Sequence, residues 1–315
     1  MAIDIRYLQR HEIDIHKWNA CIQNAGNGLL YANSWWLDGM SDNWCGLVCN
    51  NYEAVMPLTW KKKFGIRYLY QPWFVPSLGM FSQQDYNIHL NDFLAAIPAE
   101  YRYWDLDVNE YNAISGEDKK LTTSKRTNYI IPWKSYNDVY NSYSRLARRK
   151  IKKTVNMGVI ISETDNVEEI IKSYRDHYKD KHPAILDKDY RRLASCCRRA
   201  QQTGHVTCYT ALSKDRHTVA FYLLLHDGKY TYSLLGGSTA EGKEVGVFYA
   251  LTDRAISDAM QNKRSFRFEG SDIPGIAFFN QQFGPECIHY LHLVRNDLRF
   301  PFNMLKKYRD YSKKW

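Results

Sequence analysis

Apolar and polar positions in the second half of this 315-residue chain follow the periods of strands and helices in turn. Asp227 and Gly228 separate two apolar runs, and this dipeptide is a strong short-range signal for a β-hairpin. A glycine-rich stretch then leads into an amphipathic helix. The elements that the pattern predicts are, in order, strands at 205–212, 218–225 and 229–235, a helix at 248–259, a strand at 265–269, a helix at 274–283 and a strand at 288–295.

The first half is an incomplete echo of the second, since both run strand, helix, helix, three strands, helix and strand, although the two halves share no detectable sequence repeat. We therefore predict an α/β fold with mixed sheets in two domains, 1–133 and 134–315, with the boundary within 128–137. The remaining predicted strands are at 4–8, 44–49, 52–60, 66–70, 103–108, 127–132 and 159–162, and the remaining helices at 13–23, 34–40, 85–96, 136–157, 167–179 and 187–202.

The formal net charge of +9 favours anionic partners such as nucleotides, tRNA, CoA or an acidic membrane surface. The 7 cysteines contain no CxxC motif and the 10 histidines lack the spacing of metal ligands, so we expect reduced thiols and no metal site. The N-terminus lacks the apolar core of a signal peptide, and no stretch approaches the ~20 apolar residues of a membrane span. We expect a cytoplasmic protein, for which peripheral contact with a membrane stays open.

Six residues in and beside the glycine-rich stretch form the best-supported candidate binding site. The backbone N–H groups of such a strand-to-helix connection, together with the positive end of the helix, can bind a phosphate or a carbonyl oxygen. A flexible surface loop would have the same composition, so that alternative stays open. The six residues are Gly236, Gly237, Ser238, Gly242, Lys243 and Gly246.

Four cations recur at positions i, i+3, i+4 and i+7 of the helix predicted at 136–157, opposite a stripe of tyrosines. Such a face can hold a diphosphate or a tRNA backbone, because arginine presents a fork of donors to phosphate oxygens. The alternative is a solvated face on a helix that links two domains. The four cations are Arg145, Arg148, Arg149 and Lys152.

Two carboxylates and one loop complete the candidate chemistry. Glu269 ends a predicted strand and Asp272 follows in the next turn, so either could accept a proton from an attacking ammonium. Glu269 could instead pair with a buried arginine, and Asp272 could cap the helix that begins at Pro274. Gln71 and Trp73 lie in a proline-flanked loop that would either line an acceptor groove between the domains or pack their interface.

The element order resembles the GNAT acyltransferase fold in tandem. Two such domains in one chain resemble the FemABX family of aminoacyl-tRNA-dependent peptidoglycan ligases and its Fem-like bacterial relatives. The resemblance implies two domains packed across a cleft, with the acceptor on the side of the first domain and the donor at the six glycine-rich residues of the second. The stretches that carry it best are 232–237, 247–251, 268–272 and 278–284.

Departures from the usual GNAT pattern bear on the donor. The CoA-binding motif of that fold has a glycine at its pivot and a small residue at its last position. This chain keeps the pivot as Gly246, but it has the bulky Phe248 at the last position. The tyrosine that serves many GNAT enzymes as general acid is matched here by Phe278 or Phe279. The first half keeps a single glycine, Gly79, at the corresponding connection, so we expect its donor site to be degenerate.

The resemblance therefore predicts an enzyme that moves an acyl or aminoacyl group to an amine by direct attack. Its donor would be aminoacyl-tRNA or acyl-CoA, used as a co-substrate, and no cofactor would be tightly bound. The acceptor would be an anionic or nucleotide-linked molecule, such as a cell-wall precursor. A CoA-dependent N-acetyltransferase is one alternative, and a non-catalytic binding protein that kept the fold is another. The sequence leaves the oligomeric state open.

Overall fold

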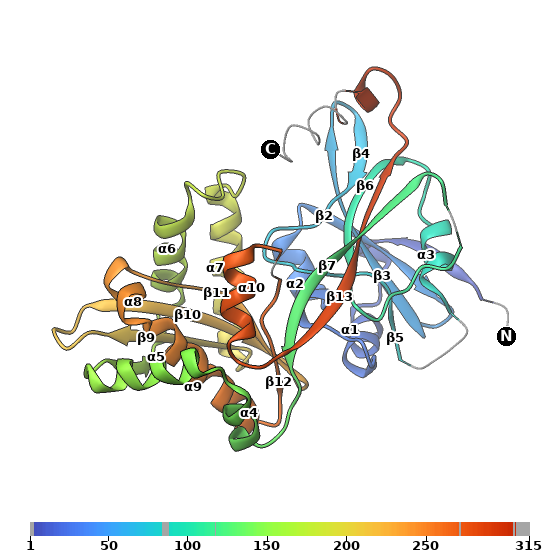
Figure 1. Cartoon of the computed structure of the whole chain (residues 1–315). Helices are drawn as coiled ribbons and strands as arrows, with labels where there is room; N and C mark the ends of the chain where they lie inside the picture. Colours follow the sequence, from blue (N-terminus) through green and yellow to red (C-terminus); the bar gives the residue numbers. More distant parts are fainter. Residues whose placement is uncertain (1–2, 84–87, 117, 271, 305, 307–315) are drawn as a thin grey trace. The chain divides into compact units, whose positions relative to one another are not determined.

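A computed structural model describes residues 3–83, 88–116, 118–270, 272–304 and 306 of the chain. Its contacts group the described residues into two compact units, Met1–Arg126 with His289–Trp315, and Thr127–Ile288. Figure 1 shows the chain coloured along its sequence. The expected domain ranges, 1–133 and 134–315, stay a prediction, but the contact grouping differs from them because the last segment of the chain joins the first unit.

Strands of the first unit are hydrogen-bonded in the order β1-β2-β3-β4-β6-β13, and β5 pairs with β3. All neighbours are antiparallel except β4 and β6, which run parallel. The elements are β1 (Ile5–Gln9), the 3₁₀ turn η1 (Arg10–Glu12), α1 (Ile15–Asn24), η2 (Leu30–Ala32), α2 (Ser34–Met40), β2 (Asn43–Cys49), β3 (Ala54–Lys63), β4 (Ile66–Leu69), β5 (Phe81–Ser82), α3 (Leu90–Ala95), β6 (Tyr101–Val108) and β13 (Glu286–Asn296).

Alternation along β2 explains why helices cover both faces of this sheet. Gly46 faces Trp18 of α1, and no side chain larger than hydrogen would fit there. Its neighbour Leu47 points the other way, into a core cluster that includes Phe93 of α3. Trp18 is fully buried, and its indole N–H is satisfied by the carbonyl oxygen of Ala32 at 2.9 Å. The sheet is therefore buried on both faces at its centre.

Strands of the second unit follow the order β7-β12-β11-β10-β9-β8, in which β11 and β12 are parallel and the other neighbours antiparallel. Helices α4, α5 and α9 share a core with one face of this sheet, while α6 and α7 pack on the other (Figure 1). The elements are β7 (Leu121–Ile131), α4 (Tyr136–Ser142), α5 (Arg145–Asn156), β8 (Ile160–Glu163), α6 (Val167–Tyr178), α7 (Asp187–Gln202), β9 (Val206–Leu212), β10 (Thr218–His226), β11 (Tyr230–Ser238), α8 (Ala240–Val245), α9 (Val247–Gln261), β12 (Ser265–Arg267) and α10 (Pro274–Gln281).

Three local predictions need correction. The helix expected at 136–157 is two helices, because Ser144 leaves helical geometry and caps α5 by accepting a hydrogen bond from the backbone N–H of Ala147. The glycine-rich stretch is not one loop, since its first part ends β11 and its middle part forms the short helix α8. Of the helix expected at 85–96, residues 85–87 lie outside the described residues, and α3 is confined to Leu90–Ala95.

In the described part of the chain, none of the helices is long and apolar enough to cross a membrane. The cytoplasmic location stays a prediction.

The lone glycine of the first unit's connection, Gly79, has a packing role. Its φ angle is +97°, and a Cβ there would lie 2.2 Å from Oδ1 of Asn112 and 2.9 Å from Cβ of Val108. The same Oδ1 accepts a hydrogen bond from the N–H of Met80 at 2.7 Å, so it cannot move away freely. Glycine is therefore required by the backbone conformation and by the buried asparagine together.

Replacing Gly79 with alanine should lower the free energy of unfolding by about 2–3 kcal/mol, because it combines a strained φ with a displaced buried hydrogen bond. Urea unfolding measures the change. Gly26→Ala is the matched control, since a Cβ there meets nothing within 4 Å. Equal stability of the two variants would contradict this account of Gly79.

Candidate functional site

The second unit contains a cavity where two parallel strands separate. β11 and β12 pair only at Tyr230↔Ser265, Thr231↔Phe266 and Tyr232↔Arg267, after which β11 continues to Ser238 beside β10 alone. Residues 233–238 line a cavity of about 790 Å³ at this divergence. Peptide groups on the free edge of a strand need hydrogen-bond partners, so this edge can bind a ligand through its backbone.

A β-bulge in β11 lies in the wall of the same cavity. Leu223 of β10 pairs with Leu235, but Leu224 pairs with Ser233, which leaves Leu234 as an extra residue in β11. The hydroxyl of Tyr222 donates to Oγ of Ser233 at 2.7 Å and fixes this part of the strand. Bulges interrupt a ladder and re-aim its peptide groups, and they are frequent beside active sites.

A buried ion pair holds the end of β12 at the divergence. Nε of Arg267 lies 3.0 Å from Oε1 of Glu269, and the two side chains are only 1% and 3% exposed. Asn128 of β7 binds this corner twice, because its amide donates to Oε2 of Glu269 at 3.3 Å and its Oδ1 accepts from the N–H of Gly270 at 3.1 Å. Glu269 therefore has the buried arginine partner that was its alternative interpretation, while a catalytic role stays a prediction.

The backbone at this corner is strained. Glu269 has a φ angle of +54°, in the left-handed region that non-glycine residues seldom occupy, and Gly270 follows at +87°. Strained residues persist where surrounding contacts over-determine them, and they concentrate at functional sites. The contacts of Asn128 and Arg267 supply that constraint here.

Asp272 does not line the cavity, and it does not cap α10. Its Oδ1 accepts a hydrogen bond from the N–H of Thr127 at 3.1 Å. The N-cap of α10 is Ile273, with Pro274 as the first helical residue and no capping side chain. The capping interpretation of Asp272 is therefore wrong, and a role in proton transfer stays a prediction with less geometric support than that of Glu269.

All six residues of the glycine-rich prediction line the cavity. Their glycines are required by close packing as well. A Cβ on Gly236 would lie 2.7 Å from the ring of Phe248, and a Cβ on Gly237 would lie 3.0 Å from the hydroxyl of Tyr178. A Cβ on Gly242 would lie 2.2 Å from the carbonyl oxygen of Val219. Binding by these residues stays a prediction.

The N-terminus of α9 lies against this cavity. Gly246 has a φ angle of +90° and serves both as the end of α8 and as the N-cap of α9, without a side chain to cap the helix. Lys150 of α5 packs its aliphatic stem on Gly246 and donates from Nζ to the carbonyl oxygen of Glu244 at 3.2 Å. An anionic group would be stabilised here by the helix end and by the nearby ammonium.

Sequence reasoning missed one wall of the cavity, which comes from α6 and the turn after it. Tyr174, Tyr178, Lys181 and His182 line this wall, and the two tyrosine rings lie 4.8 Å apart. Burial raises the pKa of Tyr174 to about 12 and also raises the pKa of Tyr178, so both phenols stay protonated donors near pH 7. The spacing of the two tyrosines on one helix face was the available signal.

Phe248 points toward the cavity. The centroid of its ring lies 4.9 Å from that of Tyr222 and 5.4 Å from that of Phe279, and all three residues line the cavity. Phe278 is 55% exposed and is not among the lining residues. Of the two phenylalanines, Phe279 is therefore the one that lines the cavity, and neither it nor Phe248 can donate a proton.

The predicted basic face on α5 is exposed and lies outside the cavity lining. Within the described residues, no carboxylate pairs with Arg145, Arg149 or Lys152. Arg148 differs, because its Nη2 donates to the carbonyl oxygen of Tyr143 at 2.9 Å. Arg148 thus joins α5 to the end of α4, and binding of an anionic substrate by the four cations stays a prediction.

Gln71 and Trp73 belong to the first unit. Gln71 donates to the carbonyl oxygen of Val75 at 2.6 Å and accepts from the N–H of Asp107 at 3.2 Å, so it braces its own loop. Trp73 is 43% exposed. Their role in lining a groove stays a prediction.

Among the residues that the structure describes, no cluster of three His, Cys, Asp or Glu side chains could hold a metal ion.

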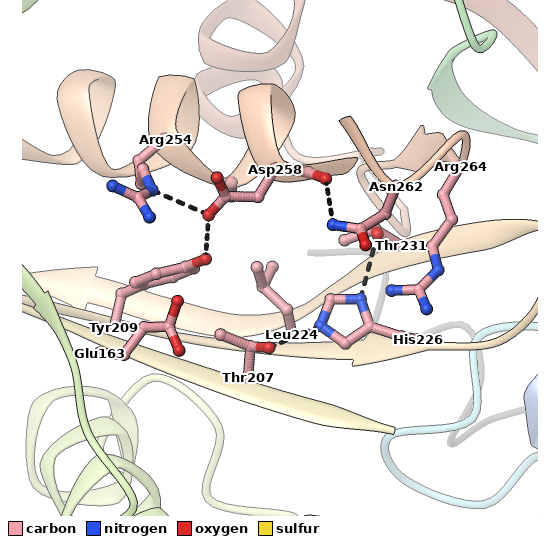
Figure 2. A pocket seen from close by; sticks show the side chains of 11 residues that line it. Glu163, Thr207, Tyr209, Leu224, His226, Thr231, Arg254, Asp258, Asn262 and Arg264 are labelled. Atoms are coloured by element: carbon pink, nitrogen blue, oxygen red, sulfur yellow. Dashed lines mark hydrogen bonds and ion pairs between the residues drawn. The ribbon is translucent and has the colours of Figure 1, made fainter. Parts of the chain in front are cut away.

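A second cavity, of about 230 Å³, lies between the sheet and the C-terminal half of α9 (Figure 2). Both ring nitrogens of His226 are hydrogen-bonded, to Oγ1 of Thr231 at 3.0 Å and to Oγ1 of Thr207 at 2.9 Å. Asp258 accepts from Arg254 at 2.8 Å and from the hydroxyl of Tyr209. These polar groups satisfy one another, so we assign them to the packing of α9 on the sheet.

Burial, aided by the charge of Arg264, lowers the pKa of His226 to about 3. The unfolded chain would bind a proton at this residue below about pH 6.5, whereas the folded protein would not until about pH 3. The free energy of unfolding should therefore fall by up to ~1.4 kcal/mol per pH unit as the pH drops through this window. Urea unfolding of His226→Gln alongside the parent isolates the contribution, and parallel pH profiles would contradict it.

Comparisons with known proteins bear on the fold. Residues 141–272 match the family model described as acetyltransferase (GNAT) domain. The structure of FemX superposes with a TM-score of 0.66 at 14% identity, covering 97% of this chain and 99% of that one. The C-terminal domain of a protein described as a lysylphosphatidylglycerol synthetase from Agrobacterium fabrum gives 0.58 at 11% identity, with 93% and 95% covered.

L-PGS from Bacillus licheniformis gives a TM-score of 0.57 at 12% identity, with 93% of this chain and 95% of that one covered. Curated protein sequences gave no match. At these identities the structural likeness establishes the fold, and it confirms the predicted resemblance at that level. The chain therefore has the fold of FemX, and its residues 141–272 match a GNAT domain.

Proposed function

We propose that this protein is a Fem-like acyltransferase that moves an acyl or aminoacyl group onto an amine. The observation that carries the proposal is the cavity at the divergence of β11 and β12, with its bulge at Leu234 and the end of α9 beside it. An acyl transfer needs donors for the carbonyl oxygen and a positive site for the leaving part of the donor. The free edge of β11 and the N-terminus of α9 supply these two features in one cavity.

In the proposed reaction the acceptor amine attacks the carbonyl carbon of the donor directly. The carbon–nitrogen bond forms, the carbonyl oxygen takes up negative charge against the N–H groups of β11, and the ester or thioester bond then breaks. The amine loses one proton and the leaving oxygen or sulfur gains one. Glu269 is the carboxylate that lines the cavity, so we assign it the proton from the amine, with Arg267 and Asn128 holding it in place.

The aromatic wall favours an aminoacyl donor over CoA. The ring of Phe248 occupies the space in front of Gly236, where a CoA-binding GNAT motif has a small residue. Tyr174 and Tyr178 also line the cavity with rings that carry a hydroxyl group. Such rings can stack on a planar group of the donor and donate a hydrogen bond to it. A CoA-dependent N-acetyltransferase remains the first alternative, and a non-catalytic protein with this fold the second.

The test offers purified protein either aminoacyl-tRNA or acetyl-CoA, with amine-bearing nucleotide-linked cell-wall precursors as acceptors, and detects products by mass spectrometry. We expect transfer from aminoacyl-tRNA and weak or no binding of CoA in calorimetry. Gly237→Val should lower the transfer rate by about 100-fold, since its side chain would press on Phe221 and Tyr178 and displace the strand edge. Gly228→Ala is the control, because nothing lies within 4 Å of its Cβ.

Each other outcome favours a named alternative. Stoichiometric binding of CoA with transfer of an acetyl group would establish the CoA-dependent enzyme. Binding of an acceptor without transfer from either donor would establish the non-catalytic protein.

The basic face of α5 generates a separate prediction about an anionic donor. Arg149→Ala with Lys152→Ala should weaken tRNA binding and reduce its log–log dependence on salt by about 1 for each lost phosphate contact. Stability should change by less than about 1 kcal/mol, because both side chains are exposed. Arg198→Ala is the control, since Arg198 pairs with Glu168 at 2.8 Å. Unchanged tRNA binding in filter or fluorescence assays would make this face a solvated surface.

A further inference from the structure

An apolar patch lies on the first unit where the β3–β4 hairpin meets the segment after β13. We define it by Phe64, at the tip of the hairpin, with Phe300 and Phe302. Phe64 and Phe300 are each 77% exposed, and the rings of Phe64 and Phe302 stack at a centroid distance of 6.3 Å. Figure 1 shows the segment after β13 running beside β4. Clustered, exposed aromatic rings are unusual on a protein surface and mark sites of interaction.

The hairpin holds Phe64 outward at a conformational cost. Phe64 has a φ angle of +50° and Gly65 follows at +78°, so the turn uses a left-handed residue that is not glycine. Such a conformation is uncommon for a bulky side chain. No packing in the core compensates for it, because the ring is largely exposed. An interaction made by the outward ring would offset this cost.

Two adjoining grooves flank the patch and carry an excess of positive charge. Their volumes are about 350 and 630 Å³, and both are lined by Ile66, Leu298 and Phe302. Of the two acidic residues in their linings, Glu100 pairs with Arg67 at 2.7 Å and Asp105 accepts from the hydroxyl of Tyr103 at 3.4 Å. The basic lining residues are Lys62, Lys63, Arg67, Arg102, Arg299 and Lys306.

We propose that this face docks the protein on the surface of an anionic phospholipid bilayer. Aromatic rings at the tip of a hairpin can enter the boundary between headgroups and acyl chains, while the surrounding ammonium and guanidinium groups meet anionic headgroups. Lys63 already extends over the ring of Phe64 at 5.4 Å, and Lys306 over that of Tyr103 at 4.4 Å, so cationic heads accompany the rings. Membrane docking of this kind is independent of the donor that the second unit uses.

A single-stranded nucleic acid also binds to aromatic and basic residues, and the geometry favours the bilayer over it. Stacking platforms for bases lie in a groove that follows the backbone of the nucleic acid. Here Phe64, one of the two most exposed rings of the patch, stands at the tip of a hairpin, and Phe300 and Phe302 have no polar group to bind a base edge. Protruding aromatic rings surrounded by basic residues match a bilayer, whose acyl chains are apolar and whose headgroups are anionic.

The experiment is co-sedimentation of the full chain with vesicles of phosphatidylcholine, alone or with roughly one-third phosphatidylglycerol. We expect binding to the anionic vesicles to be at least about tenfold stronger, and to weaken as salt screens the headgroup charge. The variant Phe64→Ser/Phe300→Ser/Phe302→Ser should lose at least about tenfold in binding to anionic vesicles, since its apolar contacts are gone. Lys62→Glu/Arg299→Glu should abolish the preference for anionic vesicles.

Tyr111→Ser is the matched control, because Tyr111 is an aromatic residue of the same unit that is 62% exposed. It should bind as the parent does. All substituted side chains are at or near the surface, so urea unfolding should show each variant folded. The proposal is overturned by equal sedimentation of the parent and the triple variant, or by equal binding to neutral vesicles. A triple variant that changes only the oligomeric state would assign the patch to a second copy, and one that changes only binding to a single-stranded RNA would assign it to nucleic acid.

Discussion

The second unit's cavity depends on the point at which β12 stops pairing with β11. β12 pairs with β11 at three residues and with β7 at two, and the buried pair of Arg267 and Glu269 lies where the chain leaves the sheet. Burying an ion pair costs desolvation energy, and removing one partner alone leaves an uncompensated buried charge worth roughly 3–5 kcal/mol. The loss of either partner would therefore destabilise the divergence. Asn128 adds to this pair by binding both the carboxylate of Glu269 and the N–H of Gly270.

Packing around this divergence explains why small and large residues alternate in the cavity wall. Gly236 and Gly237 are small because Phe248 and Tyr178 approach the strand closely. A larger residue on β11 would push these rings out, and a smaller residue in place of Phe248 would leave a void beside Tyr222. The shape of the cavity and the packing of the unit thus depend on the same contacts.

The order of elements and the six glycine-rich residues could be predicted from sequence, because both depend on local periods and on residues with special backbone freedom. The wall from α6 could not, since Tyr174 and Tyr178 reach the cavity only through tertiary packing. The break at Ser144 was hidden by an apolar stripe that continues across it, although serine is a good N-cap. The sequence did not predict which residue pairs with Glu269, because that depends on which side chains are buried together in the folded unit.

The return of the chain to the first unit has a consequence for synthesis on the ribosome. Residues 291–296 of β13 pair with residues 103–108 of β6, across a separation that includes the whole second unit. The first unit cannot complete its sheet until these residues have left the exit tunnel, whereas the strands β7 to β12 are already available. The nascent chain must therefore keep this edge of β6 unpaired while the intervening unit is made, and an unpaired edge can pair with other chains during translation.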